Sequence, residues 1–237
     1  TTTLYSLLQM VSTPKKNVIT VEDPVEYRLN GITQVQTRPV AGLTFASALK
    51  SILRQDPDVI LIGEIRDLET AEIAVSAALT GHLVLSTLHT NDAAGAISRL
   101  INIGVPPFLV GSALIGTVAQ RLVRRVCTKC RQSSVPTSNE ARLLLGDERS
   151  QETPQIYRSA GCNDCYQTGY KGRKSIYEIL PVSSKIKSLI MEGGNDDAIK
   201  RQAAAEGMVS LAQSAISDVL DGYTTLDEIS RIVDMNH

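Results

Sequence analysis

The four cysteines of this chain lie in two pairs whose spacing suits a metal ion. Cys127 and Cys130 enclose two residues, and after 31 further residues Cys162 and Cys165 repeat the pattern. Two such pairs supply the four sulfur ligands that tetrahedral Zn²⁺ prefers. Two disulfides are the alternative, but cysteines are sparse and no signal peptide is visible, which favours the metal. Because all four thiolates would close the site, we expect the zinc to be structural and the chemistry to lie elsewhere.

Three carboxylates follow a run of β-branched residues. Glu22, Asp23 and Glu26 come directly after the apolar residues 18–21. Open α/β sheets bind ligands at the carboxyl ends of their strands, and carboxylates there can hold Mg²⁺ through water. A solvated acidic loop is the alternative that this motif leaves open.

Glu64 follows a second apolar run, residues 59–62, and only Gly63 lies between the run and this carboxylate. A carboxylate at this place suits a general base or a water-positioning residue for attack on a γ-phosphate. Many phosphate-binding strands carry Asp directly before this Glu, whereas Gly63 stands here. Magnesium is therefore expected to depend on Thr1 and on water-bridged carboxylates. The alternative for Glu64 is a surface residue that follows a core strand.

His82 and His89 flank a third apolar run, residues 83–88. His89 falls at the carboxyl end of this run, on the sheet edge expected for Glu22 and Glu64, where a histidine can sense a γ-phosphate. His82 falls at the opposite end, so its contact with a nucleotide is less evident from topology. A hydrogen-bonded core histidine is the alternative for each.

Thr1, Thr2 and Thr3 begin a helical pattern that is similar to the helix following a P-loop, whose backbone N–H groups and GK[ST] motif cradle phosphates. The glycines and the lysine of that motif are missing, so a helix capped by any threonine is the alternative. The chain starts at Thr1 rather than Met, which we interpret as the start of a fragment from a longer chain.

Short apolar runs alternate with helical patterns in the first half of the chain. Continuous apolar runs of this length suit parallel strands covered on both faces. Their alternation with helices predicts an α/β fold with a parallel sheet. The expected strands are 18–21, 59–62 and 83–88, and the expected helices are 44–54, 69–79, 91–102 and 108–125.

The composition changes after the first cysteine pair. Residues 131–160 are polar and poor in strand formers, which predicts a small lobe of their own. A tail of short helices is expected over 183–191, 195–206, 210–220 and 226–233. We therefore predict a core over 1–125, a tetracysteine lobe with a return to the core over 126–180, and a helical region over 181–237.

The overall composition excludes some classes of function. Of the 237 residues 43% are hydrophobic and 21% charged, and the net charge is −1, so a broad nucleic-acid or membrane-binding field is not expected. The longest apolar stretch, residues 108–119, is too short to span a bilayer. No nucleic-acid partner is predicted.

Taken together, the motifs resemble one family, the secretion ATPases that power type II secretion and type IV pilus assembly. VEDPVEY resembles the Asp box of that family, LRQDPDVILIGEIRD its Walker B signature, and TGHLVLSTLHTNDA its His box. TTTLYSLL looks like the end of its Walker A region, and QRLVRRVCTKC and GCNDCYQTGYKGRKSIYEIL resemble its zinc-binding lobe. The similarity runs from Thr1 to about Leu180, the helical tail fits the family too, and Gly63 is the residue that this family carries at its place.

The resemblance implies the carboxyl-terminal ATPase domain of such a motor: a RecA-like P-loop NTPase core, a tetracysteine zinc-binding lobe and a helical tail. It implies a homohexamer that hydrolyses ATP with Mg²⁺ at the cytoplasmic face of the inner membrane, where it acts on a platform protein and associates with the membrane through partners. Glu64 is similar to the catalytic glutamate of the family, and Thr1 to its magnesium-binding hydroxyl. The other residues that it places around the nucleotide and its magnesium are Thr2, Glu22, Asp23, Glu26, His82 and His89, and the structural zinc ligands are Cys127, Cys130, Cys162 and Cys165.

Some alternatives stay open. The chain lacks a phosphate-binding loop, so alone it is expected to be inactive, and a purely structural fragment is one alternative. A pilus retraction motor is another, but such motors lack the tetracysteine lobe, so the cysteines disfavour it. The sequence does not separate pilus assembly from type II secretion. Arg54 and Arg66 lie inside the Walker B-like signature without an assigned role, and exposed salt bridges are the default interpretation for both.

Overall fold

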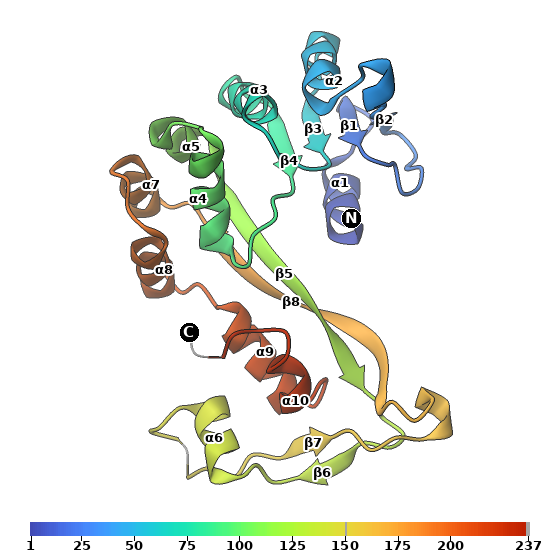
Figure 1. The fold of residues 1–237 in the computed structure, drawn as a ribbon, viewed down its shortest axis with the longest axis vertical. Coiled ribbons are helices and arrows are strands. Elements are labelled where there is room, and N and C mark those ends of the chain that lie inside the picture. Colours follow the sequence, from blue (N-terminus) through green and yellow to red (C-terminus); the bar gives the residue numbers. More distant parts are fainter. Residues whose placement is uncertain (150, 236–237) are drawn as a thin grey trace. The chain divides into compact units, whose positions relative to one another are not determined.

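The computed structural model describes residues 1–149 and 151–235 (Figure 1). They form two compact units, each built from two separate stretches of the chain. The predicted helical tail contributes to both units, and the three-region division predicted from the sequence stays a prediction. Unit 1 consists of Thr1–Thr117 and Pro181–Gln202, and unit 2 of Val118–Leu180 and Ala203–His237.

Unit 1 contains a four-stranded sheet in the order β2-β1-β3-β4, in which all neighbouring strands are parallel. The strands are β1 (Val18–Glu22), β2 (Thr33–Gln36), β3 (Val59–Ile62) and β4 (Leu83–Ser86). Every residue of β1 and β3 is buried, as expected for apolar strands covered on both faces. The predicted α/β class with a parallel sheet is confirmed. The sequence pattern does not predict β2, because its sequence TQVQ contains only one apolar residue.

The register of this sheet aligns the carboxyl ends of three strands at one edge. Val21 in β1 lies opposite Ile62 in β3, which in turn lies opposite Ser86 in β4. Residues that end or follow these strands therefore meet at the same edge. Those with the chemistry singled out above are Glu22, Glu64 and His89.

Three helices of unit 1 begin where polar side chains cap them. Thr44, Asp67 and Asp92 each accept a hydrogen bond from a backbone N–H in the first turn of α2, α3 and α4, and Gly104 ends α4 in the left-handed conformation. The predicted helices at these three places are confirmed. The helices are α1 (Thr2–Val11), α2 (Phe45–Ile52), α3 (Leu68–Leu79), α4 (Ala93–Ile103), α5 (Pro107–Ala113), α7 (Ser184–Met191) and α8 (Asp196–Ala205), which begins in this unit.

A buried cluster fixes α1 against the sheet. Tyr5 and Leu8 of this helix pack with Val18 of β1 and with Val59 and Leu61 of β3. Each large apolar side chain that is fully buried stabilises the folded state by about 1.5–3 kcal/mol. The cluster therefore holds the first turn of α1 close to the carboxyl edge of the sheet.

The helix predicted over residues 108–125 is wrong beyond Ala113. Helix α5 ends at Ala113, and a strand, β5 (Gly116–Val126), takes up most of the remainder. It pairs with β8 (Tyr170–Pro181), a second strand that the sequence pattern does not predict. β-branched residues recur over residues 117–126 and favour a strand. The periodicity of this segment alone fits either a helix or a strand. Pairing with the distant strand β8 therefore determines that it forms a strand.

Unit 2 contains most of β5 and β8 and a small lobe between them in sequence. The lobe pairs β6 (Gln132–Ser134) with β7 (Ile156–Arg158) in an antiparallel ribbon and carries α6 (Ser138–Leu145), so the polar stretch 131–160 has elements of its own (Figure 1). The short helix η3 (Asn163–Cys165) follows, and α9 (Leu211–Leu220) and α10 (Leu226–Ile229) complete the unit. Within the described parts of both units, we find no helix with both the length and the apolar character needed to cross a bilayer.

A buried carboxylate ties α10 to β5. Glu228 is only 2% exposed and accepts hydrogen bonds from the Arg124 guanidinium at 2.5 and 2.8 Å and from the Arg124 backbone N–H at 3.0 Å. The same guanidinium lies 4.1 Å from the centre of the Tyr170 ring. Burial alone raises the pKa of Glu228, but the hydrogen bonds and the charge of Arg124 outweigh burial and hold that pKa below its usual value.

We expect Glu228→Gln to lower the free energy of unfolding by about 2 kcal/mol at pH 7, because hydrogen bonds to a charged group are lost. A carboxylate with a lowered pKa contributes stability that is fully present above its unfolded-state pKa, about 4.3. That stability is lost as the pH falls through the folded-state pKa. The difference between the two proteins should therefore shrink below about pH 4, which urea unfolding at several pH values will measure. Asp227→Asn, an exposed neighbour, is the control; an equal difference at every pH would contradict the ionic contact.

Candidate functional site

A pocket of about 270 Å³ lies at the carboxyl edge of the sheet in unit 1. The end of β1, the segment after β3, the segment after β4 and the start of α1 all contribute to its lining. The pocket therefore forms where the parallel register aligns the strand ends, which is where open α/β sheets bind ligands. The predicted residues that line it are Thr1, Glu22, Asp23, Glu26, Glu64 and His89.

The segment after β3 is held by hydrogen bonds to both neighbouring strands. The Gly63 N–H donates to the Val21 carbonyl at 2.8 Å, and the Ile65 N–H donates to the Thr87 carbonyl at 3.1 Å. The Thr87 hydroxyl donates back to the Gly63 carbonyl at 2.6 Å. These three bonds fix the backbone on both sides of Glu64.

Both oxygens of the Glu64 carboxylate are engaged. Oε1 lies 2.5 Å from Nη2 of Arg66, and Oε2 lies 3.1 Å from Nε2 of His89. Burial raises the pKa of Glu64, but hydrogen bonds and charge from Arg66 and His89 outweigh it and hold the pKa below its usual value. Glu64 is therefore an ionised carboxylate at neutral pH, as a group that accepts a proton must be.

Glu22 is a buried carboxylate at the base of the same pocket, with 4% of its surface exposed. It accepts hydrogen bonds from the Thr20 hydroxyl at 2.5 Å, from the Gln34 amide at 3.2 Å and from the Tyr5 hydroxyl. Burial and the bond to Glu22 raise the pKa of Tyr5 to about 12, so this hydroxyl stays a donor. Within the described residues these hydrogen-bond donors to Glu22 are all neutral.

This set of oxygen donors fits a hard divalent cation. Asp23 and Glu26 are exposed on the pocket wall beside Glu22, and the Thr1 residue that precedes α1 lines the same space. Carboxylates, a hydroxyl and water are the ligands that Mg²⁺ takes beside a phosphate. The pocket thus brings an ionised base and a group of magnesium-compatible oxygens together.

Two predicted residues lie elsewhere. Among the described residues, neither Thr2 nor His82 lines the pocket. Nδ1 of His82 lies 2.9 Å from the Ala77 carbonyl and 3.1 Å from the Thr80 hydroxyl, next to the end of α3. Because His82 precedes β4 and His89 follows it, the two histidines lie at opposite ends of this strand. Nucleotide contact by Thr2 and His82 stays a prediction.

Sequence reasoning missed the residues that hold Glu22. Tyr5 lies four residues after Thr1, one helical turn on, and this spacing was a usable signal for a side chain facing the same site. Gln34 lies in β2, whose polar sequence gives no strand signal. Thr20 lies two residues before Glu22 on one strand, a spacing that places both side chains on the same face and was also a usable signal.

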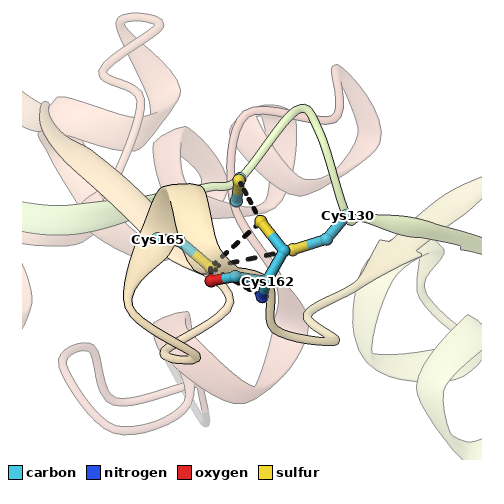
Figure 2. Close-up of side chains that lie close together, drawn as sticks. Cys130, Cys162 and Cys165 are labelled. Atoms are coloured by element: carbon cyan, nitrogen blue, oxygen red, sulfur yellow. Dashed lines mark hydrogen bonds between the residues drawn. The ribbon is translucent and has the colours of Figure 1, made fainter.

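The four cysteines of unit 2 form one cluster, in which all four sulfurs lie within 4.8 Å of one another. Figure 2 shows Cys130, Cys162 and Cys165 turned toward a common centre. The sulfurs of Cys127 and Cys162 are 3.9 Å apart, those of Cys130 and Cys165 3.8 Å, and those of Cys162 and Cys165 3.7 Å. Sulfurs about 2.3 Å from a tetrahedral ion would be about 3.8 Å from one another, whereas a disulfide needs about 2.05 Å. The cluster fits a metal ion, and all four cysteines are free thiols.

Backbone N–H groups point at two of these sulfurs. Gly161 donates to Sγ of Cys130 at 3.3 Å, and Gly169 and Cys162 each donate to Sγ of Cys165 at 3.2 Å. Gly169 has a φ of 76°, and a Cβ atom there would lie 2.6 Å from Cβ of Ser159, so only glycine fits. These donors support thiolate sulfurs, which is the form that binds a metal.

An ion-pair bridge joins the two cysteine pairs. Lys129, in the first pair, and Lys171 lie 2.9 and 2.8 Å from the carboxylate oxygens of Asp164, in the second pair. Hydrogen bonds from Lys171 and Lys129, together with their charges, lower the pKa of Asp164. The bridge therefore places positive charge beside the cluster while it connects the two loops that carry the thiols.

Comparisons with known proteins place these features in a family context. Residues 1–231 match the family model described as Type II/IV secretion system protein. The chain is 50% identical over 227 residues to the type IV pilus assembly ATPase PilB of Thermus thermophilus, covering 96% of this chain and 26% of that protein. It is 47% identical over 232 residues to type II secretion system protein E of Pseudomonas aeruginosa, covering 98% of this chain and 46% of that protein.

A solved structure shows the same fold. The pilus retraction motor PilT with bound ADP superposes with a TM-score of 0.69 and 28% sequence identity, covering 98% of this chain and 57% of that chain. The present chain thus spans less than half the length of the two curated relatives named above.

Proposed function

The chain belongs to the type II/IV secretion system protein family, and from this membership we propose that it is the ATPase part of a motor for type IV pilus assembly or type II protein secretion. The observation that carries the proposal is the pocket of unit 1, whose lining contains both the ionised Glu64 and the oxygen donors Glu22, Asp23 and Glu26. An ionised base opposite a magnesium-compatible wall is what hydrolysis of a nucleoside triphosphate requires.

In the proposed mechanism Glu64 acts on the attacking water. Its carboxylate orients a water molecule toward the γ-phosphorus and accepts the proton as the new bond forms. His89 lines the same pocket from the segment after β4, where it would contact the γ-phosphate. Thr1, Glu22, Asp23 and Glu26 would hold Mg²⁺, directly or through water, and the ion would neutralise charge on the phosphate oxygens.

The proposal includes a structural zinc ion bound by Cys127, Cys130, Cys162 and Cys165. Its support is the clustering of the four sulfurs within 4.8 Å of one another, with three separations of 3.7–3.9 Å, and the N–H donors that face two of the sulfurs. All four ligand positions would be filled by thiolates, which leaves no open position for a reacting water. Zinc would therefore stabilise unit 2 and take no part in hydrolysis.

The wider assembly is part of the same proposal. We infer a homohexamer at the cytoplasmic face of the inner membrane that acts on a platform protein and reaches the membrane through such partners. The support is the resemblance of the sequence motifs to secretion ATPases and the similarity to two relatives, a pilus assembly ATPase and a type II secretion protein.

ATP hydrolysis by the full-length protein tests the proposal. We expect the full-length protein to release phosphate from ATP, and residues 1–237 alone to release almost none, because the phosphate-binding loop is the main electrostatic grip on the transferred group. Phosphate release by both purified proteins, at equal zinc content, is the measurement. A full-length protein without ATP hydrolysis would contradict the motor, and an active 1–237 would contradict the inactivity expected of these residues alone.

A pilus retraction motor is the second candidate, favoured by the superposition on PilT. The lower identity to that protein, 28% against 50% for the pilus assembly ATPase, weighs against it, as does the cysteine cluster. Deleting the gene separates the two. Cells without an assembly or secretion motor lack surface filaments or retain their secreted proteins, whereas cells without a retraction motor keep their pili.

A further inference from the structure

Four large apolar side chains are exposed on the two-stranded ribbon that β5 and β8 form in unit 2 (Figure 1). Val118 and Leu122 of β5 are 54% and 45% exposed, and Tyr177 and Ile179 of β8 are 38% and 56% exposed. Single exposed apolar side chains are normal on a protein surface, whereas several that share one face mark a site of interaction.

The four side chains share one face of the ribbon. The Gln120 amide donates to the Ser175 hydroxyl at 3.1 Å, so these two side chains point to the same face. Further along, the Cys127 N–H donates to the Gly169 carbonyl at 2.9 Å, so the strands run antiparallel. Because side chains alternate between the two faces of a strand, residues an even number of positions from Gln120 or Ser175 lie on this open face. Its apolar members are Val118, Leu122, Tyr177 and Ile179.

The opposite face of the ribbon is packed against α9. Lys174 on that face pairs with Asp218 of α9, and the apolar side chains there are at most 7% exposed, namely Ala119, Val123, Ile176 and Leu180. An antiparallel sheet with one face on a core normally carries polar side chains on its other face. Large apolar side chains on the open face therefore indicate that a partner covers it.

Positive charge borders the open face at the end that leads into the cysteine cluster. Arg173 lies on this face, two residues before Ser175, and a Cβ atom on the adjacent Gly172 would lie 3.9 Å from Cδ of Arg125. Both arginines are exposed, and neither has an ion-pair or hydrogen-bond partner among the residues that the structure describes. None of the open-face residues within 118–122 and 173–179 is acidic. Two unpaired guanidinium groups favour a partner that brings carboxylates.

The size of the open face favours a short segment over a whole subunit. A stable protein–protein interface buries about 800 Å² on each partner and involves about 20–30 residues a side. Four apolar side chains and two arginines are too few for such an interface. Tyrosine and arginine are, however, residue types that are enriched where binding energy concentrates.

We propose that the open face binds a short segment of a partner protein, whose apolar side chains contact the four apolar residues and whose neighbouring carboxylates pair with Arg173 and Arg125. This goes beyond the proposed function, because no residue of the open face is among the described residues that line the pocket of unit 1. The segment lies along the ribbon, with its acidic end toward the cysteine cluster.

Photo-crosslinking by the full-length protein in its native cells tests the inference. Leu122→p-benzoylphenylalanine places a light-activated group on the open face. We expect it to attach to a segment of another protein in which mass spectrometry finds several Asp or Glu residues beside the attachment site. Adding Arg173→Glu should lower the crosslinking yield roughly 10-fold or more, because like charges then meet, whereas Arg173→Lys should keep most of the yield. Thermal unfolding of each variant confirms that the fold is kept.

The chain offers matched controls for both changes. Leu143 of α6 lies in the same unit and is 44% exposed, so Leu143→p-benzoylphenylalanine measures chance contacts of an equally exposed group. Arg142→Glu, which reverses a charge outside the ribbon, should leave the yield of the Leu122 variant unchanged.

Several results would overturn the inference. One is a yield from the Leu122 variant no higher than from the Leu143 variant, and another is attachment to this same chain, to a second copy of it or to lipid. A partner segment without carboxylates, or a yield that Arg173→Glu leaves unchanged, would equally exclude the acidic segment. ATP hydrolysis is measured separately, so each of these results leaves the proposed function standing.

Discussion

Replacing Glu64 by Gln in the full-length protein will leave ATP bound and remove most of its hydrolysis. The amide keeps the size and shape of the carboxylate but accepts no proton, so the step that general-base catalysis speeds by roughly 10²- to 10⁴-fold loses that factor. Affinity for ATP should stay within about threefold, because a nucleoside triphosphate is held chiefly by contacts to its phosphates and by magnesium, and the residue that acts on the attacking water adds little to that grip. Single-turnover phosphate release and equilibrium binding of a fluorescent ATP analogue measure the two quantities separately.

Glu69→Gln is the control for this replacement. Glu69 is also a glutamate of unit 1, five residues further on, but its side chain is 60% exposed and pairs with Lys50 at 2.6 Å. Its loss removes the same charge away from the pocket, and turnover should not change. Equal turnover in Glu64→Gln and in the unchanged protein would contradict a catalytic role for Glu64.

The second large effect concerns the cysteine cluster. The purified chain should carry about one zinc ion, and Cys165→Ser should abolish it, because a structural site contributes on the order of 10 kcal/mol to folding through its bound ion. We expect the midpoint of thermal unfolding to fall by on the order of 10 °C or more. Elemental analysis of the purified proteins and circular dichroism during heating give both values.

Thr128→Ser is the matched control for the cluster. Thr128 lies between the ligands Cys127 and Cys130 and is exposed, so the change removes one methyl group without touching a thiol. Zinc content and the unfolding midpoint should both stay as they are. A chain without metal in which mass spectrometry finds two disulfides would overturn the zinc site.

Elements defined by local signals could be predicted from the sequence. Strand β3 is a continuous apolar run and β1 is mostly β-branched, and both bury every residue. Helices α3 and α4 begin at aspartate caps and are followed closely by glycine. Such signals depend on a few neighbouring residues. The sequence also predicts that Glu22, Glu64 and His89 lie at the same side of the sheet, because parallel strands place their carboxyl ends on one side.

Features that depend on distant partners could not be predicted. From the sequence alone, the residues of β5 are predicted to continue the preceding helix. They form a strand because they pair with β8, which begins more than forty residues after β5 ends. The burial of Glu22 depends on Tyr5 and Gln34, which belong to two other elements. Likewise, the contact of Arg66 with Glu64 depends on a side-chain rotamer, which spacing alone leaves undetermined.

The segment between the two cysteine pairs has a consequence for how well this chain tolerates inserted residues. Thirty-one residues separate Cys130 from Cys162, whose sulfurs lie within 4.8 Å, and β6 and β7 run side by side from that closure. The entropy lost on closing a loop grows only with the logarithm of its length, so doubling it costs about 0.6 kcal/mol. Insertions between α6 and β7 should therefore be tolerated at small thermodynamic cost, which makes this segment the natural place to introduce a label or a whole inserted domain.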